Sequence, residues 1–156
     1  MAEARKHRTA ICAFWHLKLE FELGRLLYRQ NRLKEAIAIF TQLRLEAEIF
    51  QERYLFLMSE GYILRCRLKL GLYNPEQFET LINNLETVHF TDQNFVELVA
   101  DYAETCQDKK KQLQLIEKAQ GYLQTIIERS GLQNHIISVD DNSRPIEFCL
   151  ELQMSQ

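Results

Sequence analysis

Proline and glycine are scarce in this chain, which has two prolines and five glycines among its 156 residues. An all-β protein of this length needs more of both, because they form its turns. The chain also lacks any apolar run near the roughly 20 residues that span a bilayer. Its basic N-terminus is followed by charged positions rather than by the apolar region of a signal peptide. We therefore expect a cytoplasmic, all-α protein that is not inserted in a membrane.

The residue patterns of common catalytic and metal sites are absent from the sequence. There is no glycine-rich phosphate loop, no nucleophile elbow and no His-Glu-x-x-His motif. No two histidines are four residues apart, and none stands at metal-ligand spacing with a cysteine. We expect no enzyme activity, no catalytic residues, no metal site and no cofactor. The cysteines contain no Cys-x-x-Cys pair and are interpreted as free, buried thiols of a reducing compartment: Cys12, Cys66, Cys106 and Cys149.

Charge is unevenly distributed along the chain, whose net charge is −3. Residues 1–74 carry a net charge of +5, and residues 75–156 carry −8. One interpretation is scatter over solvated helix faces. The other is that the two ends meet opposite charges, on a partner or in head-to-tail self-association. The overall acidity makes nucleic-acid binding the less favoured function.

Apolar residues in the segment 33–50 follow the period of a helix. Their spacing keeps them on one face at 3.6 residues per turn, and charged residues fall on the opposite face. The preceding segment has leucines in the same rhythm, and a polar connection at residues 29–32 separates the two. Helices joined so closely pack antiparallel. The residues expected in this interface are Leu33, Ala36, Ile37, Phe40, Leu43, Ala47 and Phe50 in the second helix, with Leu19, Leu23, Leu26 and Leu27 in the first.

Four residues of this helix pair carry a resemblance to a known family. Leu23 and Gly24 stand in the first helix, and Ala36 and Phe40 stand in the second. The arrangement resembles the tetratricopeptide repeat, in which small residues let two helices approach closely. The large residue of that motif falls at Glu20, which departs from the pattern, and the proline that follows the repeat is missing. The resemblance implies stacked helix hairpins with a groove that clamps acidic peptide ends.

The first helix is expected to run from the segment 4–8 to Gln30, and it is unusually broad in its apolar surface. Ile11, Phe14, Trp15 and Leu17 lie on more than one face. Such breadth indicates either burial on two sides or an exposed apolar face.

Helix-capping residues predict where the later helices begin and end. The repeat interpretation also requires a break between the second and third helices. The capping residues and this break together predict about six helices. Their boundaries fall near Phe50–Arg53, at Gly71, at Asn74-Pro75, at Thr91-Asp92, after Asp108 and at Gly131.

A shift of 38 residues aligns the apolar positions of three successive helix pairs. The alignment favours an all-α solenoid of stacked antiparallel hairpins over residues 1–131, rather than an irregular bundle. The aligned sets are Phe40/Phe78/Ile116, Leu43/Leu81/Ala119, Ala47/Leu85/Leu123, Leu26/Leu64/Tyr102 and Leu23/Gly61/Val99.

Residues 132–156 have a different character. The segments 135–139 and 146–152 alternate or cluster apolar residues as strands do, and the turn-rich segment 140–145 separates them. Both a short C-terminal β-hairpin and an extended tail remain open. Because an isolated two-stranded hairpin is marginal in water, the strands would pack on the helices, pair with a second copy in a homodimer, or belong to a following domain.

The expected function is a non-catalytic protein-interaction module, a scaffold or adaptor that binds a peptide or partner domain in a helical groove. The alternatives are a regulatory or dimerisation module of a signalling or transcription system, and a helical-repeat nucleic-acid binder. Arginine can bind carboxylates with two hydrogen bonds. Each candidate residue also has an interpretation without a partner: the arginines could lie on a solvated face, and the tryptophan could lie in the core. The candidate partner-binding residues are Arg25, Arg29, Arg32, Arg65 and Trp15.

Overall fold

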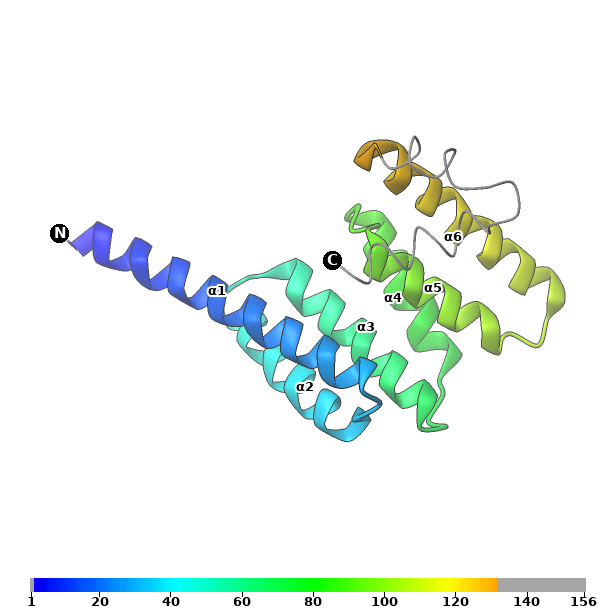
Figure 1. Ribbon diagram of the computed structural model, residues 1–156, viewed down its shortest axis with the longest axis horizontal. Coiled ribbons are helices and arrows are strands. Elements are labelled where there is room, and N and C mark those ends of the chain that lie inside the picture. The colour runs from blue at the N-terminus through cyan, green and yellow to red at the C-terminus, as the bar shows by residue number, and fades with distance from the viewer. Residues whose placement is uncertain (1, 132–156) are drawn as a thin grey trace.

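The computed structural model describes residues 2–131, without the side chains of residues 4–10, and the described part is all-helical (Figure 1). The hairpin or tail expected at residues 132–156 lies outside the described residues. The break expected between the second and third helices is confirmed, at residues 50–52. The six helices of the described residues are α1 (Ala2–Arg29), α2 (Leu33–Ile49), α3 (Arg53–Lys69), α4 (Pro75–Thr87), α5 (Gln93–Thr105) and α6 (Lys109–Ser130).

The helices form an elongated array in which each one packs against its successor (Figure 1). α3 lies at the centre, because it contacts α1, α2, α4 and α5. The helices that pack closely against α1 are α2 and α3, and those that pack closely against α5 are α3, α4 and α6. The odd-numbered helices therefore follow one another along the array. The N-terminal part of α1 extends beyond α2 and α3 (Figure 1).

Four helix ends close in the same way. Two positions after the last residue of α1, α2, α3 and α4, one residue adopts left-handed backbone geometry. Its N–H donates to the carbonyl three residues back, and the next N–H donates to the carbonyl five residues back. These bonds satisfy carbonyls that the helix leaves unpaired. The four residues are Asn31, Gln51, Gly71 and His89, with φ of 60°, 57°, 78° and 58°.

Side-chain caps begin the later helices at the expected positions. The Asn74 side chain accepts a hydrogen bond from the N–H of Glu76 at 3.1 Å. Asp92 accepts from the N–H of Phe95 at 3.2 Å, which starts α5. These caps confirm the predicted starts of α4 and α5, because each supplies an acceptor to a helix N–H that has no partner within the helix.

Gly24 and Phe40 form the tightest contact between α1 and α2. A Cβ atom at Gly24 would lie 2.6 Å from the Phe40 ring, closer than carbon atoms can approach. The ring has no room to withdraw, since it is fully buried and stacks on Tyr62 with centroids 4.8 Å apart. Phe21 packs edge-on against both rings of this stack, 5.8 Å from Phe40 and 5.7 Å from Tyr62 between ring centroids. The close approach expected of Gly24 is therefore present.

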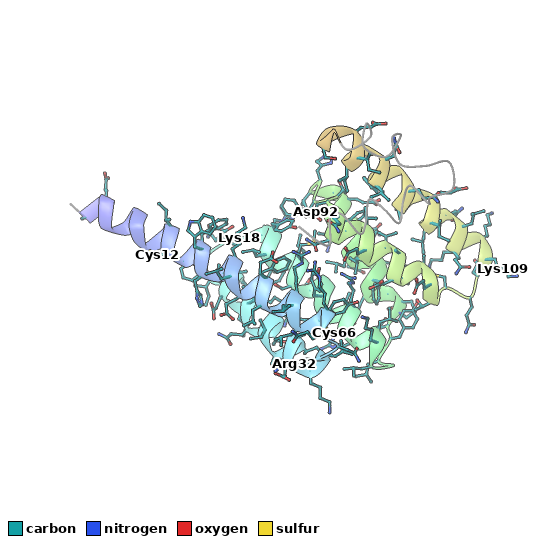
Figure 2. All side chains as sticks on the ribbon, viewed as in Figure 1. Cys12, Lys18, Arg32, Cys66, Asp92 and Lys109 are labelled. Carbon is teal, nitrogen blue, oxygen red and sulfur yellow. The ribbon has the colours of Figure 1, made fainter. Side chains whose placement is uncertain are left out.

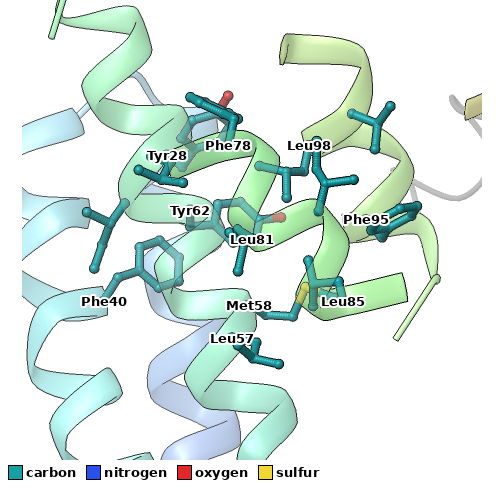
Figure 3. Packing of buried hydrophobic residues seen from close by; sticks show 14 of the residues in the cluster. Tyr28, Phe40, Leu57, Met58, Tyr62, Phe78, Leu81, Leu85, Phe95 and Leu98 are labelled. Carbon is teal, nitrogen blue, oxygen red and sulfur yellow. The ribbon is translucent and has the colours of Figure 1, made fainter. Parts of the chain in front are cut away.

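A continuous apolar core runs from this contact through α3 into α4 and α5 (Figure 3). The three aligned sets from the even-numbered helices are buried, with one exception. Ile116 of α6 is exposed, because α6 instead turns Leu115 inward, four residues before the buried Ala119. The buried members of those sets are Phe40, Phe78, Leu43, Leu81, Ala119, Ala47, Leu85 and Leu123.

Three leucines that the periodicity placed in the first interface lie on the surface. Leu19, Leu23 and Leu26 are exposed, whereas Leu27 is buried as expected. α1 has neighbours on one side only, and Leu17 and other residues of its opposite face fill that contact. Phe50, expected on the buried face of α2, follows the end of that helix and is exposed too.

The cysteines differ in environment. Cys12 is exposed, Cys66 is buried and Cys106 is intermediate, and all three are free thiols. The expectation of a buried thiol is therefore wrong for Cys12, and Cys149 lies outside the described residues. Burial raises the pKa of the Cys66 thiol to about 11, because the thiolate loses its hydration.

Replacing Gly24 by alanine tests the tightest contact of the core. Helix propensity alone favours alanine by about 1 kcal/mol, but the added methyl group would overlap the Phe40 ring. We expect Gly24→Ala to lower the free energy of unfolding in urea by about 1–3 kcal/mol, a typical cost of overpacking. Gly121→Ala is the matched control, since a methyl group added there would have no atom within 4 Å, and it should stabilise the protein. Similar effects of the two substitutions would contradict the contact.

The thiol environments predict an order of alkylation. A pKa near 11 leaves about one Cys66 thiol in a thousand ionised at pH 8. We expect iodoacetamide to modify Cys12 long before Cys66 in the folded protein, and both at similar rates in urea. Mass spectrometry of proteolytic peptides would follow the two sites. Equal rates in the folded protein would show that Cys66 is accessible.

Candidate functional site

A groove of about 430 Å³ opens between α1 and the first residues of α3 and α5. We call it the α1 groove. Its base is apolar, with Phe21 and Leu55 buried, and Phe14 forms an exposed aromatic wall. A second hollow of about 460 Å³ between α3 and α4 has a mostly polar lining and offers less apolar surface to a ligand. The residues that line the α1 groove are Phe14, Lys18, Phe21, Glu22, Arg25, Glu52, Tyr54, Leu55 and Asn94.

A chain of hydrogen bonds runs beneath the groove from α1 to α5. The Nε of Arg25 donates to the hydroxyl of Tyr62 at 3.1 Å, and that hydroxyl donates to the Asn94 side-chain oxygen at 2.8 Å. The amide of Asn94 in turn donates to the Tyr54 hydroxyl at 3.1 Å, which donates to Asp92. Burial raises the pKa of both tyrosines, so both stay protonated as donors. The floor of the groove is thus fixed from three helices.

Arg65 is buried beside this chain and links α3 to α5. Its Nε donates to Asp101 at 2.6 Å, and its Nη1 donates to Glu97 at 3.1 Å. The guanidinium carbon lies 4.7 Å from the ring centroid of Tyr28 and 4.9 Å from that of Tyr62. Burial alone would lower the pKa of Arg65, but the nearby oxygens, Asp101 foremost, raise it. Arg65 therefore remains charged and holds carboxylates of its own chain.

The structure brings two of the four candidate arginines together. Arg25 donates to the hydroxyl of Tyr62 and Arg65 lies against the Tyr62 ring, and Arg25 also pairs with Glu22 at 3.0 Å. Arg29 is the exposed last residue of α1. Their role in binding a partner stays a prediction.

Arg32 lies outside this cluster, in the turn at the far end of α1 from its free N-terminal part (Figure 2). It pairs with Glu35 on the surface, which lowers the pKa of that carboxyl. Lys18, by contrast, projects near the groove (Figure 2). Arg25 and Arg32 are seven positions apart, about 10 Å at the helical rise of 1.5 Å per residue, and each already pairs with a carboxylate of its own chain.

Trp15 lies on the surface of α1, and its side chain is 55% exposed. The alternative that Trp15 belongs to the core is therefore wrong. Its ring packs edge-on against Phe14, with centroids 5.9 Å apart, and the ammonium of Lys18 lies 5.3 Å from the Trp15 ring. Trp15 thus continues the aromatic wall of the groove onto the outer face of α1.

Several groove residues were not singled out by the sequence. Tyr54 and Tyr62 follow the apolar spacing of α3 and so give no sign of a polar role, and Asn94 carries no signal of its own. Tyr54 and its partner Asp92 are 38 residues apart, which equals the shift that aligns the helix pairs in the sequence. This spacing is the one sequence signal that relates the two residues.

Among the side chains that the structure describes, those of residues 2–3 and 11–131, no group of three or more His, Cys, Asp or Glu could hold a metal ion. None of the helices in this part of the chain is both long and apolar enough to cross a bilayer. Comparison with protein-family models, with curated proteins and with solved structures finds no match.

Replacing Arg65 by methionine tests its role between α3 and α5. The substitution keeps much of the volume but leaves Asp101 and Glu97 without their cation. We expect the free energy of unfolding in urea to fall by about 2–4 kcal/mol, near the cost of breaking a buried ion pair. Arg32→Met is the matched control and should have no measurable effect, because its pair with Glu35 is exposed. Equal losses in the two variants would contradict this role.

Proposed function

We propose that this protein is a non-catalytic interaction module that binds a segment of a partner protein in the α1 groove. The observation that carries the proposal is an exposed aromatic wall that adjoins a buried apolar base, in a groove also lined by cations. Phe14 forms the wall, Phe21 and Leu55 form the base, and Lys18 and Arg25 are the cations of the lining. Aromatic and arginine side chains are the residue types that most often dominate binding energy at protein interfaces.

The fixed floor supports tight binding. Tyr62 and Asn94 are held by hydrogen bonds from α1 and α3, so the groove loses little conformational entropy when a ligand enters. Lys18 has aromatic rings rather than a carboxylate as its neighbours. A ligand carboxylate can therefore pair with Lys18 while an apolar side chain packs between Phe14 and Leu55.

We further propose that the array is a solenoid of the tetratricopeptide type. Three features support it: the odd-numbered helices follow one another, the helix ends after α1 to α4 close identically, and Gly24 admits the Phe40 ring. Solenoid curvature creates extended concave binding surfaces, and the α1 groove lies between the odd-numbered helices α1, α3 and α5. The departure at Glu20 and the missing proline then mark a divergent repeat.

A displayed library of random peptides tests the groove directly. We expect the full chain to enrich peptides with an apolar residue close to an acidic one. Phe14→Ala should weaken a selected peptide at least about tenfold, or about 1.4 kcal/mol, in fluorescence anisotropy. Phe50→Ala is the matched control, because Phe50 is also exposed but lies outside the groove. Failure to enrich any peptide, or equal binding by Phe14→Ala and the original chain, would overturn the proposal.

A further inference from the structure

An apolar stripe runs along the outer face of α1, next to the aromatic wall of the groove. Successive helical residues are about 100° apart, so the members of the stripe fall within a sector of about 120°. Leu17, Phe21 and Tyr28, which face the core, fall on the opposite side of the helix. The stripe consists of Ile11 (45% exposed), Trp15 (55%), Leu19 (68%), Leu23 (41%) and Leu26 (50%).

Equivalent positions elsewhere in the array are covered. The 38-residue shift takes Leu19, Leu23 and Leu26 to positions in α3 and α5 that are all buried. α3 has closely packed neighbours on both sides, whereas α1 has α2 and α3 alone. The stripe is therefore a helix-packing face that lacks a covering helix within the described residues. The equivalent residues are Leu57, Gly61 and Leu64 in α3, and Phe95, Val99 and Tyr102 in α5.

The N-terminal part of α1 also needs support. Before Leu17, none of the residues whose side chains are described is buried, and this part extends beyond the other helices (Figure 1). A free helical segment of about 15 residues is marginal in water. A covering partner along the stripe would stabilise this segment as well as bury its side chains.

We propose that a second copy of this chain covers the stripe, with the two α1 helices antiparallel. The spacing of the stripe is self-complementary about Leu19. A two-fold axis there places Leu19 against its own copy, Trp15 against Leu23, and Ile11 within one residue, about 1.5 Å along the helix, of Leu26. Each N-terminal part then lies along the anchored half of the other α1, so both are supported at once. A two-fold interface of this kind uses the same surface on both copies.

Charges at the edge of the stripe agree with this arrangement. Lys18 and Glu22 lie one turn apart along the same edge, and antiparallel packing brings Lys18 of one copy to Glu22 of the other, twice. Glu22 is exposed although it also pairs with Arg25. Exposed pairs contribute little affinity, but they favour the antiparallel register over others.

The interface is small. The stripe spans about 22 Å of helix, at 1.5 Å per residue. A contact of this length along a single helix buries less surface than a standard interface, which buries about 800 Å² per partner. We therefore expect a dimer that dissociates at micromolar concentrations.

Sedimentation velocity of the full chain between about 1 and 100 µM tests the dimer by mass action. We expect the sedimenting mass to rise from one copy to two. Leu19→Glu should keep the protein monomeric throughout, because it places two carboxylates at the two-fold axis. Leu45→Glu is the matched control, since Leu45 is an exposed leucine of α2 away from the stripe, and it should still dimerise. A chain that stays monomeric, or Leu19→Glu that dimerises normally, would overturn the proposal.

Cross-linking tests the orientation without a disruptive charge. In a Cys12→Ser background, Trp15→Cys is mixed with Leu23→Cys and oxidised. We expect a disulfide between positions 15 and 23 of different copies, identified by mass spectrometry of the linked peptides. Trp15→Cys oxidised alone should give little 15–15 disulfide. A dominant 15–15 product would indicate a parallel pair, and no product at either position would place any dimer on another surface; both results would overturn the proposal.

Discussion

The ring of Phe40 lies on the backbone of Gly24, and this contact sets how closely α1 and α2 approach. Tyr62 of α3 stacks on the same ring, so the position of the ring also fixes where α3 lies. The hydroxyl of Tyr62 then bonds to Arg25 on α1 and to Asn94 on α5. The stack of Phe40 and Tyr62 thus positions α1, α2 and α3, and the Tyr62 hydroxyl positions α5 through its hydrogen bond to Asn94. The α1 groove has its shape because of this stack.

Polar contacts between the odd-numbered helices complement the apolar core. Hydrophobic packing is largely non-directional and leaves the relative shift of two helices loosely defined. The bonds from Arg65 to Asp101 and Glu97 require one particular shift between α3 and α5. Desolvating such a pair opposes much of its attraction. Its main contribution is therefore to select one alignment of the helices over others.

How much of the structure could be predicted depends on how local its cause is. The starts of α4 and α5 could be predicted, because Asn74 and Asp92 act within one helical turn. The buried face of α2 could be predicted too, since its other face is mostly polar apart from Leu45 and Ile49. The helices at the ends of the array could not. α1 has apolar residues on two faces, and periodicity does not tell which one other helices cover, so Leu19, Leu23 and Leu26 were misplaced. The groove floor was missed because its tyrosines meet partners that are distant in sequence.

The repeated helix ends have a consequence for how this shape can persist over evolutionary time. Each closure is made by main-chain hydrogen bonds and needs one position that accepts left-handed geometry. Glycine, asparagine, glutamine and histidine all fill that position here. Descendants could exchange most surface side chains and still bend at the same places. Common ancestry with other chains would then be recorded in the spacing of these bends, at 20, 20 and 18 residues, after residue identity had faded.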